Sequence, residues 1–526
     1  MKLPRRDLLK LGASSALGWA LGGCASADSP AMQLEAAQGR LWGTPGSHQL
    51  EGMMSSERIP DGMLEVFALG GISPWETFYV VPEHGDPAKG GPYAGQQWWT
   101  FQDDDLLSIP KMFARCDGGD RKLIQPFGQD EAGMQVNLGP FVWPLRDRPD
   151  ILSRMRIWVM AHEAEPHHAA IPLALTGHGR GALRMAGFGT HLERFHQDRR
   201  PPGWAAPFSY AVYQTSLDID GNADAASSVG IHRASARPMS VRLGPENPLP
   251  KQLLRRSVEG YSGSLDGLVN YYTQRFAARR QLRGAGAVTR TPVLSDYMAA
   301  RRVMENHSVL SDMLTAEALS SSQASMCQEG SILDQTRTSL QLAAHLLTDP
   351  GAPARYVNVL EGGLYPDPSG LGYDTHGSHV RLGGSNVVHM CQQLAAIINQ
   401  PKENDPRKLD LDRHMVLINT EFGRTPSREF SKANPKGQGL DHWPWGYVVV
   451  GFGGPLDEER SGVVGAIGEN ARAIGGVSPT EHRAAMLLAM GIWPFSQESF
   501  AVADVRGVGT ELEAALHLKE RVLGYG

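Results

Sequence analysis

Short apolar runs of strand length alternate with stretches of helical spacing in the last third of the chain. Runs at 356–360, 415–419 and 447–451 have the length of buried strands, and apolar residues between 384 and 399 recur at helical intervals. Strands that alternate with helices in this way predict an α/β fold, with a mostly parallel sheet and helices on both of its faces.

Earlier parts of the chain show the same two patterns less regularly. The runs 63–69 and 157–161 predict two further strands, and the spacing becomes helical between about 245 and 350. We expect a partly helical insertion or cap at about residues 190–300, outside the core sheet. Near the C-terminus, Ser478-Pro479-Thr480-Glu481 predicts the capped start of a helix.

The N-terminal segment has the features of an export signal. Arg5-Arg6 precedes a short apolar stretch, 11–21, that is too brief to span a bilayer, and residues 1–27 therefore predict a twin-arginine signal peptide. Two processing outcomes stay open, because Cys24 lies in a lipobox-like sequence and Ala27 ends an A-x-A site. We expect a periplasmic protein, exported folded, without a transmembrane span and either free or anchored by lipid at Cys24.

Composition and charge narrow the class of protein. Residues 28–57 are polar and patternless and predict a tether, and 58–526 would then form the α/β domain. A net charge of −6 without a sustained basic stripe argues against a nucleic-acid partner. The spacing of Cys116, Cys327 and Cys391 excludes a paired-thiolate zinc site and leaves a disulfide open.

Three acidic and histidine motifs lie next to predicted strands. Asp374-Thr375-His376 follows the first run, Glu421-Phe422-Gly423-Arg424 follows the second, and Asp441-His442 comes just before the third. Ligand and metal chemistry in open α/β sheets is built at the carboxyl ends of strands. Oxygen and nitrogen ligands suit a hard or borderline divalent metal. The sequence therefore predicts a metal site here.

The first and third motifs supply the clearest metal ligands. Asp374 and His376 are two positions apart, so that both side chains share a face of an extended segment. His442 is a natural ligand, and Asp441 either orients its second nitrogen or binds metal itself. The alternative for the first motif is a turn that Asp374 caps, with solvent-exposed histidines.

The remaining candidates could handle substrate and protons. Glu421 is a candidate ligand or base, and Arg424 could grip a phosphate or sulfate group, although a Glu421–Arg424 salt bridge would also explain the pair. His167 and His168 are candidate ligands or general acids. The alternative is that one ring caps the following helix while the other faces solvent.

Taken together, several motifs resemble domain-of-unknown-function family 1501, a family of secreted proteins, between about residues 60 and 495. The motifs that carry the resemblance are Gly70-Gly71-Ile72-Ser73, Asp374-Thr375-His376, Glu421-Phe422-Gly423-Arg424-Thr425-Pro426, Gly439-Leu440-Asp441-His442 and Gly475-Gly476-Val477-Ser478-Pro479-Thr480.

That family is similar in fold to the alkaline phosphatase and sulfatase superfamily, which implies a two-metal site for a phosphate or sulfate ester. By this resemblance Asp374 and His376 correspond to an aspartate/histidine pair for one metal, and His442 to a late histidine ligand. The superfamily has an Asp-His pair at the end of a strand. By the resemblance, Glu421 stands at the position of that aspartate, and Phe422 stands at the position of that histidine.

Two further departures concern the second metal and the nucleophile. The first predicted strand ends without an aspartate, where only Ser73 or Glu76 could substitute. The position of the superfamily's nucleophile falls on His167, which is not Ser, Thr or Cys.

We expect a metal-dependent hydrolase of an anionic ester, either a small molecule or a glycan or lipid ester. Its ion would be zinc, or alternatively manganese or calcium. Attack by metal-activated water would replace a side-chain nucleophile, and His167 or His168 would protonate the leaving group. The alternative is a degenerate scaffold that binds a glycan, lipid or partner protein without turnover.

Overall fold

The computed structural model describes a large part of the chain. The described residues are 41–94, 125–182, 186–197, 199, 207–214, 238–243, 267, 268, 271, 272, 275, 334–364, 371–377, 379–430, 437, 439–496 and 499–525. The predicted signal peptide, Cys24, Cys116 and Cys327 lie outside them. Within them, no helix has the length and apolar character needed to cross a membrane.

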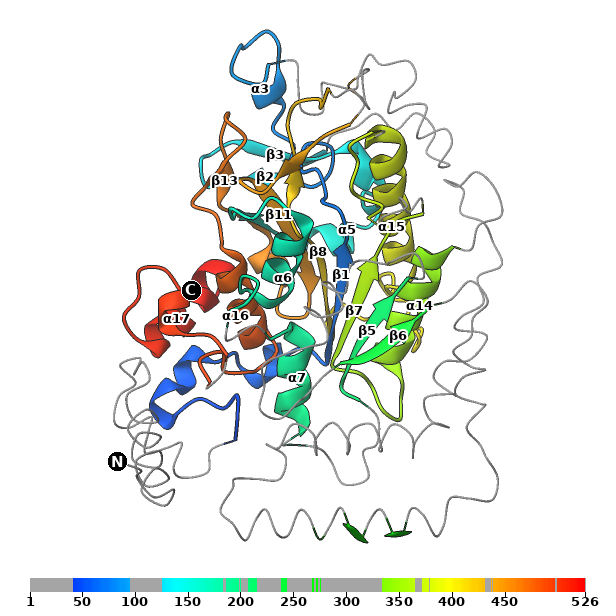
Figure 1. Cartoon of the computed structure of the whole chain (residues 1–526), viewed down its shortest axis with the longest axis vertical. Helices are drawn as coiled ribbons and strands as arrows, with labels where there is room; N and C mark the ends of the chain where they lie inside the picture. The colour runs from blue at the N-terminus through cyan, green and yellow to red at the C-terminus, as the bar shows by residue number, and fades with distance from the viewer. Residues whose placement is uncertain are drawn as a thin grey trace, which may run out of the picture.

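An eight-stranded sheet forms the centre of the molecule, in the order β12-β4-β11-β8-β1-β7-β5-β6 (Figure 1). Every neighbouring pair is parallel except the two pairs that β11 makes with β4 and β8. In chain order the strands are β1 Gly62–Ala68, β4 Met155–Met160, β5 Ser209–Tyr213, β6 Met239–Arg242, β7 Tyr356–Glu361, β8 His414–Thr420, β11 Tyr447–Gly453 and β12 Gly462–Val464. The predicted α/β class with a mostly parallel sheet is confirmed.

The central strands form because nearly all their residues are apolar and both faces of the sheet are covered. In β1, Leu64, Val66 and Ala68 enter one hydrophobic cluster, whereas Met63 and Phe67 enter clusters on the other face. The five predicted strand runs all coincide with strands of this sheet.

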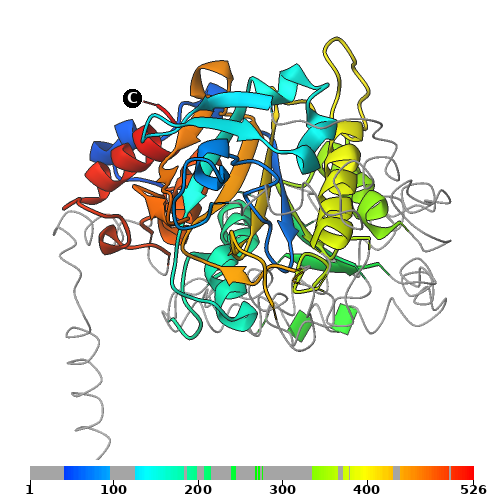
Figure 2. The same ribbon diagram turned by 90° about the horizontal axis from the view of Figure 1, so that it is seen from above.

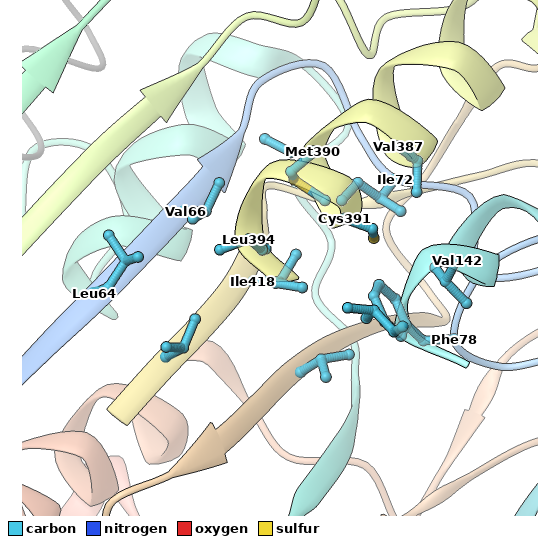
Figure 3. Packing of buried hydrophobic residues seen from close by; sticks show 14 of the residues in the cluster. Leu64, Val66, Ile72, Phe78, Val142, Val387, Met390, Cys391, Leu394 and Ile418 are labelled. Atoms are coloured by element: carbon cyan, nitrogen blue, oxygen red, sulfur yellow. The ribbon is translucent and has the colours of Figure 1, made fainter. Parts of the chain in front are cut away.

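Helices cover both faces of the sheet (Figure 2). On one face lie α14 (Gln335–Thr348) and α15 (Ser385–Ala396), and on the other lie α6 (His167–Thr176), α7 (Phe188–Gln197) and α16 (Pro479–Ala489). Figure 3 shows Val387, Met390, Cys391 and Leu394 of α15 packed toward the side chains of β1 and β8. The predicted capping box at Ser478 and Glu481 begins α16.

Shorter elements connect and extend this core. They are α3 Pro82–Gly85, β2 Gln125–Gln129, β3 Gln135–Leu138, α5 Pro149–Leu152, β9 Gly423–Arg424, β10 His442–Trp443, β13 Ala466–Ile467, β14 Ala473–Ile474 and α17 Glu511–His517, with 3-10 or π turns at Ser47–Gly52, Ser56–Arg58, Pro140–Leu145, Val380–Gly384, Glu458–Arg460, Val502–Asp504 and Leu518–Val522.

Two expectations about domain boundaries were wrong within the described residues. Strands β5 and β6 fall in the segment 190–300, yet they extend the central sheet because β5 pairs with β7. Residues 41–57, expected to belong to a tether, pack against the C-terminal helix α17. There Gln49 Nε2 donates to Glu511 Oε2 at 2.8 Å.

Strand direction gathers the predicted site residues at one edge of the sheet. The parallel strands β4, β7 and β8 end there, so the segments after them carry His167, Asp374 and Glu421 to the same place. Because β11 runs the other way, it begins at this edge, and His442 arrives just before it.

A buried ion pair joins the central strand to α16. Glu65 in β1 accepts hydrogen bonds from Arg483 of α16 (2.8 Å from Nη1), Tyr356 of β7 (2.5 Å) and Asn419 of β8 (2.8 Å). Burial raises the pKa of the Glu65 carboxyl, but the Arg483 charge and these hydrogen bonds outweigh burial and hold the pKa below its usual value. The carboxylate therefore ties three strands and a helix together.

Removing only one partner of this pair should destabilise the protein strongly. We expect Arg483→Met to lower the free energy of unfolding by about 3–5 kcal/mol, since it strands a buried carboxylate. The double variant Glu65→Leu/Arg483→Met should recover part of that loss. Urea unfolding at pH 7 measures both, and an equal or greater loss in the double variant would contradict this account.

Glu361, at the end of β7, is a second buried carboxylate. Its oxygens accept hydrogen bonds from Thr336 Oγ1 (2.7 Å), Gly363 N–H (2.8 Å) and Gln214 Nε2 (2.6 Å). Burial raises the pKa of Glu361 to about 7, because the hydrogen bonds that lower it offset only part of the desolvation.

This raised pKa predicts a pH dependence of stability. The folded protein holds the Glu361 proton more tightly than the unfolded chain, so the stabilisation is complete below about pH 4.5 and is lost as the pH rises through about 7. A shift of this size corresponds to roughly 3 kcal/mol. Urea unfolding between pH 5 and 8 should show a decline that is smaller in Glu361→Gln, and identical slopes would contradict the assignment.

Candidate metal centre

Three imidazoles converge on the carboxylate of Asp374. His376 Nε2 lies 3.0 Å and His442 Nε2 lies 3.4 Å from Asp374 Oδ1, while His167 Nε2 lies 3.3 Å from Oδ2. The Nε2 atoms of His376 and His442 are 3.2 Å apart. Side chains from three distant segments therefore present their ring nitrogens to one small volume.

In each of the three histidine rings, the Nδ1 atom contacts an oxygen outside the cluster. The Nε2 atom of each ring therefore faces Asp374. The pairs are His167 Nδ1 with Glu421 Oε1 at 2.8 Å, His376 Nδ1 with Glu429 Oε2 at 2.7 Å, and His442 Nδ1 with the Glu165 carbonyl at 3.0 Å. This is the outer arrangement that usually fixes the tautomer and direction of metal-binding histidines.

The inner atoms also fit a divalent ion. Zinc–nitrogen bonds of about 2.0–2.1 Å place tetrahedral ligand atoms roughly 3.3 Å apart, close to the spacing seen here. His167 Nε2 is buried and makes no hydrogen bond, as expected of an atom built to donate its lone pair. In two overlapping groups, one possible ligand atom of each residue lies within 4.8 Å of those of the other two; the groups are His167/Asp374/His442 and His376/Asp441/His442.

The charges of this cluster favour a cation at its centre. Burial raises the pKa of Asp374, but the contacts with the three imidazoles and the charge of Arg424 outweigh it and bring the pKa far below its usual range. Burial lowers the pKa of His167, yet contacts with Asp374 and Glu421 prevail and raise it to about 9. Positive charge, from protons or from a metal, is therefore stabilised here.

Arg424 lies beneath the carboxylate with its side chain fully buried. Its Nη2 donates to Asp374 Oδ1 at 2.5 Å. Its remaining hydrogen bonds go to the backbone carbonyls of Gly70, Gly71, Tyr373 and Leu440. The guanidinium thus points at Asp374, not at solvent, and fixes the carboxylate; the expected role as an anion clamp finds no support in this orientation.

Backbone geometry explains how the segments come so close. Arg424 and His442 are paired residues of the β9–β10 hairpin. Gly70 has a φ of 118°, and a Cβ there would lie 2.1 Å from the Asp374 nitrogen, so only glycine fits. His167 is the first residue of α6 and follows Pro166 at the N-cap.

The other predicted residues lie at the margin of this centre. Glu421 is buried, accepts from the Gly70 N–H at 2.8 Å and reaches the cluster through His167. Asp441 is exposed, and its Oδ1 lies 3.7 Å from His376 Nδ1. His168 is exposed on the first turn of α6, separate from its neighbour.

Phe422, which stands where the resemblance implies a histidine, is buried and stacks on the His442 ring at 4.5 Å between ring centres. It closes one side of the centre with an apolar surface. Three other histidines make contacts outside the centre. His162 contacts the Glu421 carbonyl (2.6 Å), and His178 and His191 stack on Phe500 and Trp42.

Sequence reasoning did not identify Glu429 or Glu165. Glu429 has no motif around it, although it lies eight positions after Glu421 in a loop that leaves the same strand. Glu165 acts through its backbone carbonyl, which no side-chain pattern can reveal. The contacts of Glu429 and Glu165 with the histidines can be recognised only once the fold is known.

These features define an α/β protein with a candidate metal centre at the carboxyl edge of a mostly parallel sheet. Residues 270–499 match the model of a family described as "Protein of unknown function (DUF1501)", which supports the resemblance drawn from the motifs. The matched region includes every residue of the centre except His167 and Glu165. A comparison with curated proteins found no match.

The outer acceptors should control metal affinity. We expect Glu421→Gln and Glu429→Gln each to weaken zinc binding by about 10- to 100-fold, because the histidines lose their charged partners. Competition with a chromogenic chelator measures the affinity. Glu163→Gln, an exposed change in the loop after β4, is the control and should bind like the wild type. Wild-type affinity in both test variants would exclude this role.

Proposed function

We propose that this protein is an exported, metal-dependent hydrolase of an anionic phosphate or sulfate ester. The observation that supports the proposal most is the convergence of three imidazole Nε2 atoms on Asp374, each ring held by an outer oxygen. This is the donor set of a catalytic or structural divalent metal site.

In this proposal His167, His376, His442 and Asp374 hold the ion. Imidazole ligands suit zinc or manganese better than calcium, which binds through oxygens. When bound, such an ion supplies a Lewis acid and lowers the pKa of water. Arg424 keeps the Asp374 carboxylate in place, and Phe422 keeps water away from one side of His442.

His168 is the residue to which we assign the proton for the leaving group. His167 is engaged at both ring nitrogens, one by Glu421 and the other facing Asp374. His168 is the next residue on α6 and is exposed to solvent. The exposed Asp441, close to His376, is the other titratable group at the rim.

The anionic nature of the substrate rests on the resemblance and on the charge of the ion. Small-molecule, glycan and lipid esters all satisfy this chemistry. The export signal in the sequence supports a periplasmic location, with lipid attachment at Cys24 as one processing outcome.

A second candidate function is a binding protein without turnover. The orientation of Arg424 favours it, since the guanidinium is consumed by Asp374 and backbone carbonyls and offers no clamp to an anion. The histidine at position 167, where the superfamily has its nucleophile, points the same way.

Metal analysis and an ester screen separate the two candidates. We expect the exported protein to contain a stoichiometric divalent ion at the Asp374 centre, lost in His376→Ala and His442→Ala, by mass spectrometry of the metal content. Generic phosphate and sulfate esters with added zinc or manganese should be hydrolysed by the wild type and at least 100-fold more slowly by these variants. A metal-loaded protein that hydrolyses neither class would favour the binding function.

A further inference from the structure

A buried threonine separates the two candidate ligands of the 374–376 segment. Asp374 and His376 contact each other at the candidate metal centre. Thr375 between them is buried, and its Oγ1 lies 2.8 Å from His379 Nδ1. Because side chains alternate along an extended segment, Thr375 points to the opposite side from the two ligands. A contact that fixes Thr375 therefore restrains both ligands at once.

His379 links Thr375 to the loop after β1. Its Nε2 lies 3.2 Å from Glu76 Oε2, and since an ionised carboxylate only accepts hydrogen bonds, the ring donates from Nε2. In that tautomer Nδ1 is an acceptor, and the Thr375 hydroxyl donates to it. The Ser73 hydroxyl donates to the same Glu76 oxygen. A directed chain of hydrogen bonds thus runs from Thr375 through His379 to Glu76.

Packed structure holds the His379 ring in place. The residue directly precedes the π turn Val380–Gly384, which continues into α15. Its ring centre lies 5.9 Å from that of Phe141. A Cβ at Gly383 would lie 3.3 Å from His379 Nδ1 and 3.2 Å from Thr375 Cγ2, so a larger residue there would crowd the contact. Since α15 packs on the central sheet, the imidazole is fixed to the core.

The backbone of Thr375 makes a second connection, toward the third motif. Leu440 N–H donates to the Thr375 carbonyl at 3.0 Å. Leu440 lies two positions before His442, another candidate ligand of the centre. The hydroxyl of Thr375 thus connects the ligand segment to the core, and its carbonyl connects the segment to the β9–β10 hairpin.

This support matters most for His376. The exposed fraction of its side chain is 40%, against 18% for His167 and 19% for His442. Packing therefore restrains the His376 ring least. Its direction rests on the contact with Glu429 and on the position of the backbone that Thr375 holds.

We propose that Thr375 and His379 are positioning residues that set the metal affinity of the candidate centre. The inference rests on the metal centre of the proposed function, but it requires no hydrolysis. The Thr375–His379 hydrogen bond holds the backbone between Asp374 and His376 before an ion binds, so that binding needs less reorganisation. Glu76 contributes by fixing the tautomer of His379.

Zinc affinity of the full chain, measured by competition with a chromogenic chelator, tests this proposal. Thr375→Val removes the hydroxyl at nearly constant shape, and we expect affinity to fall about tenfold. Thr375→Ser keeps the hydroxyl and should bind like the wild type. Thr348→Val is the matched control, because Thr348 donates to the Ala344 carbonyl (2.9 Å) at the other end of α14, and it should also bind like the wild type.

His379→Gln breaks the same link from its other end and covers the case in which Thr375→Val does not fold. We expect a similar loss of about tenfold. The double variant Thr375→Val/His379→Gln should lose no more than the weaker-binding single variant, because both changes remove one interaction. Circular dichroism identifies the folded variants.

Cobalt in place of zinc reports the arrangement of the ligands separately from stability. The visible absorption of bound cobalt depends on coordination geometry, and we expect an altered spectrum in Thr375→Val and His379→Gln but not in Thr375→Ser. If the link were merely structural, the variants would melt at a lower temperature yet keep the zinc affinity and the cobalt spectrum of the wild type.

The outcomes separate this inference from the proposed function. A wild type that binds neither zinc nor cobalt overturns the metal centre, and the positioning role with it. Wild-type affinity and spectrum in folded Thr375→Val or His379→Gln overturn the positioning role alone. An equal loss in Thr375→Ser and Thr375→Val also overturns it, since the hydroxyl would then have no part in the effect.

Discussion

The candidate metal centre depends on one buried guanidinium. Arg424 has no access to solvent, and its hydrogen bonds join Asp374 to backbone carbonyls on both sides of the site. An unpaired buried charge would be strongly unfavourable, so the arginine and the aspartate require each other. Because the backbone carbonyls of Gly70 and Gly71 accept hydrogen bonds from the Arg424 guanidinium, the segment that follows β1 is fixed to the same point, and the sheet and the site share one anchor.

This anchor also determines what the centre can do. Arg424 contacts the Asp374 carboxylate on one side, and the Nε2 atoms of three imidazoles contact it on the other. The Nδ1 atom of each imidazole contacts a further oxygen, such as Glu429 Oε2 for His376. Such layered support keeps ligand atoms in place before an ion arrives, which lowers the reorganisation that binding requires. The same contacts occupy the guanidinium of Arg424, so among the described residues this arginine is not free to bind an anion.

The sequence predicted the central sheet well because its strands are buried on both faces and therefore appear as unbroken apolar runs. Strands β5 and β6 were missed, since both are short and lie in the segment of about 190–300 that was interpreted as an insertion or cap. Asp374, His376 and His442 were predicted as ligands from their positions at strand ends. The inward direction of Arg424 and the part played by Glu165 were not predictable, because both depend on backbone carbonyls brought close only by the fold.

The reversed direction of β11 has a consequence for how the protein matures. Since that strand enters the sheet from the carboxyl edge, the hairpin before it completes the ring of nitrogens, and Glu165 and His442, which touch there, are 277 positions apart in the chain. No fragment that stops short of this hairpin can assemble the ring. Assembly of the full ring therefore requires the chain from His167 to His442 to be in place, so a fragment that ends before residue 442 would lack part of the candidate site.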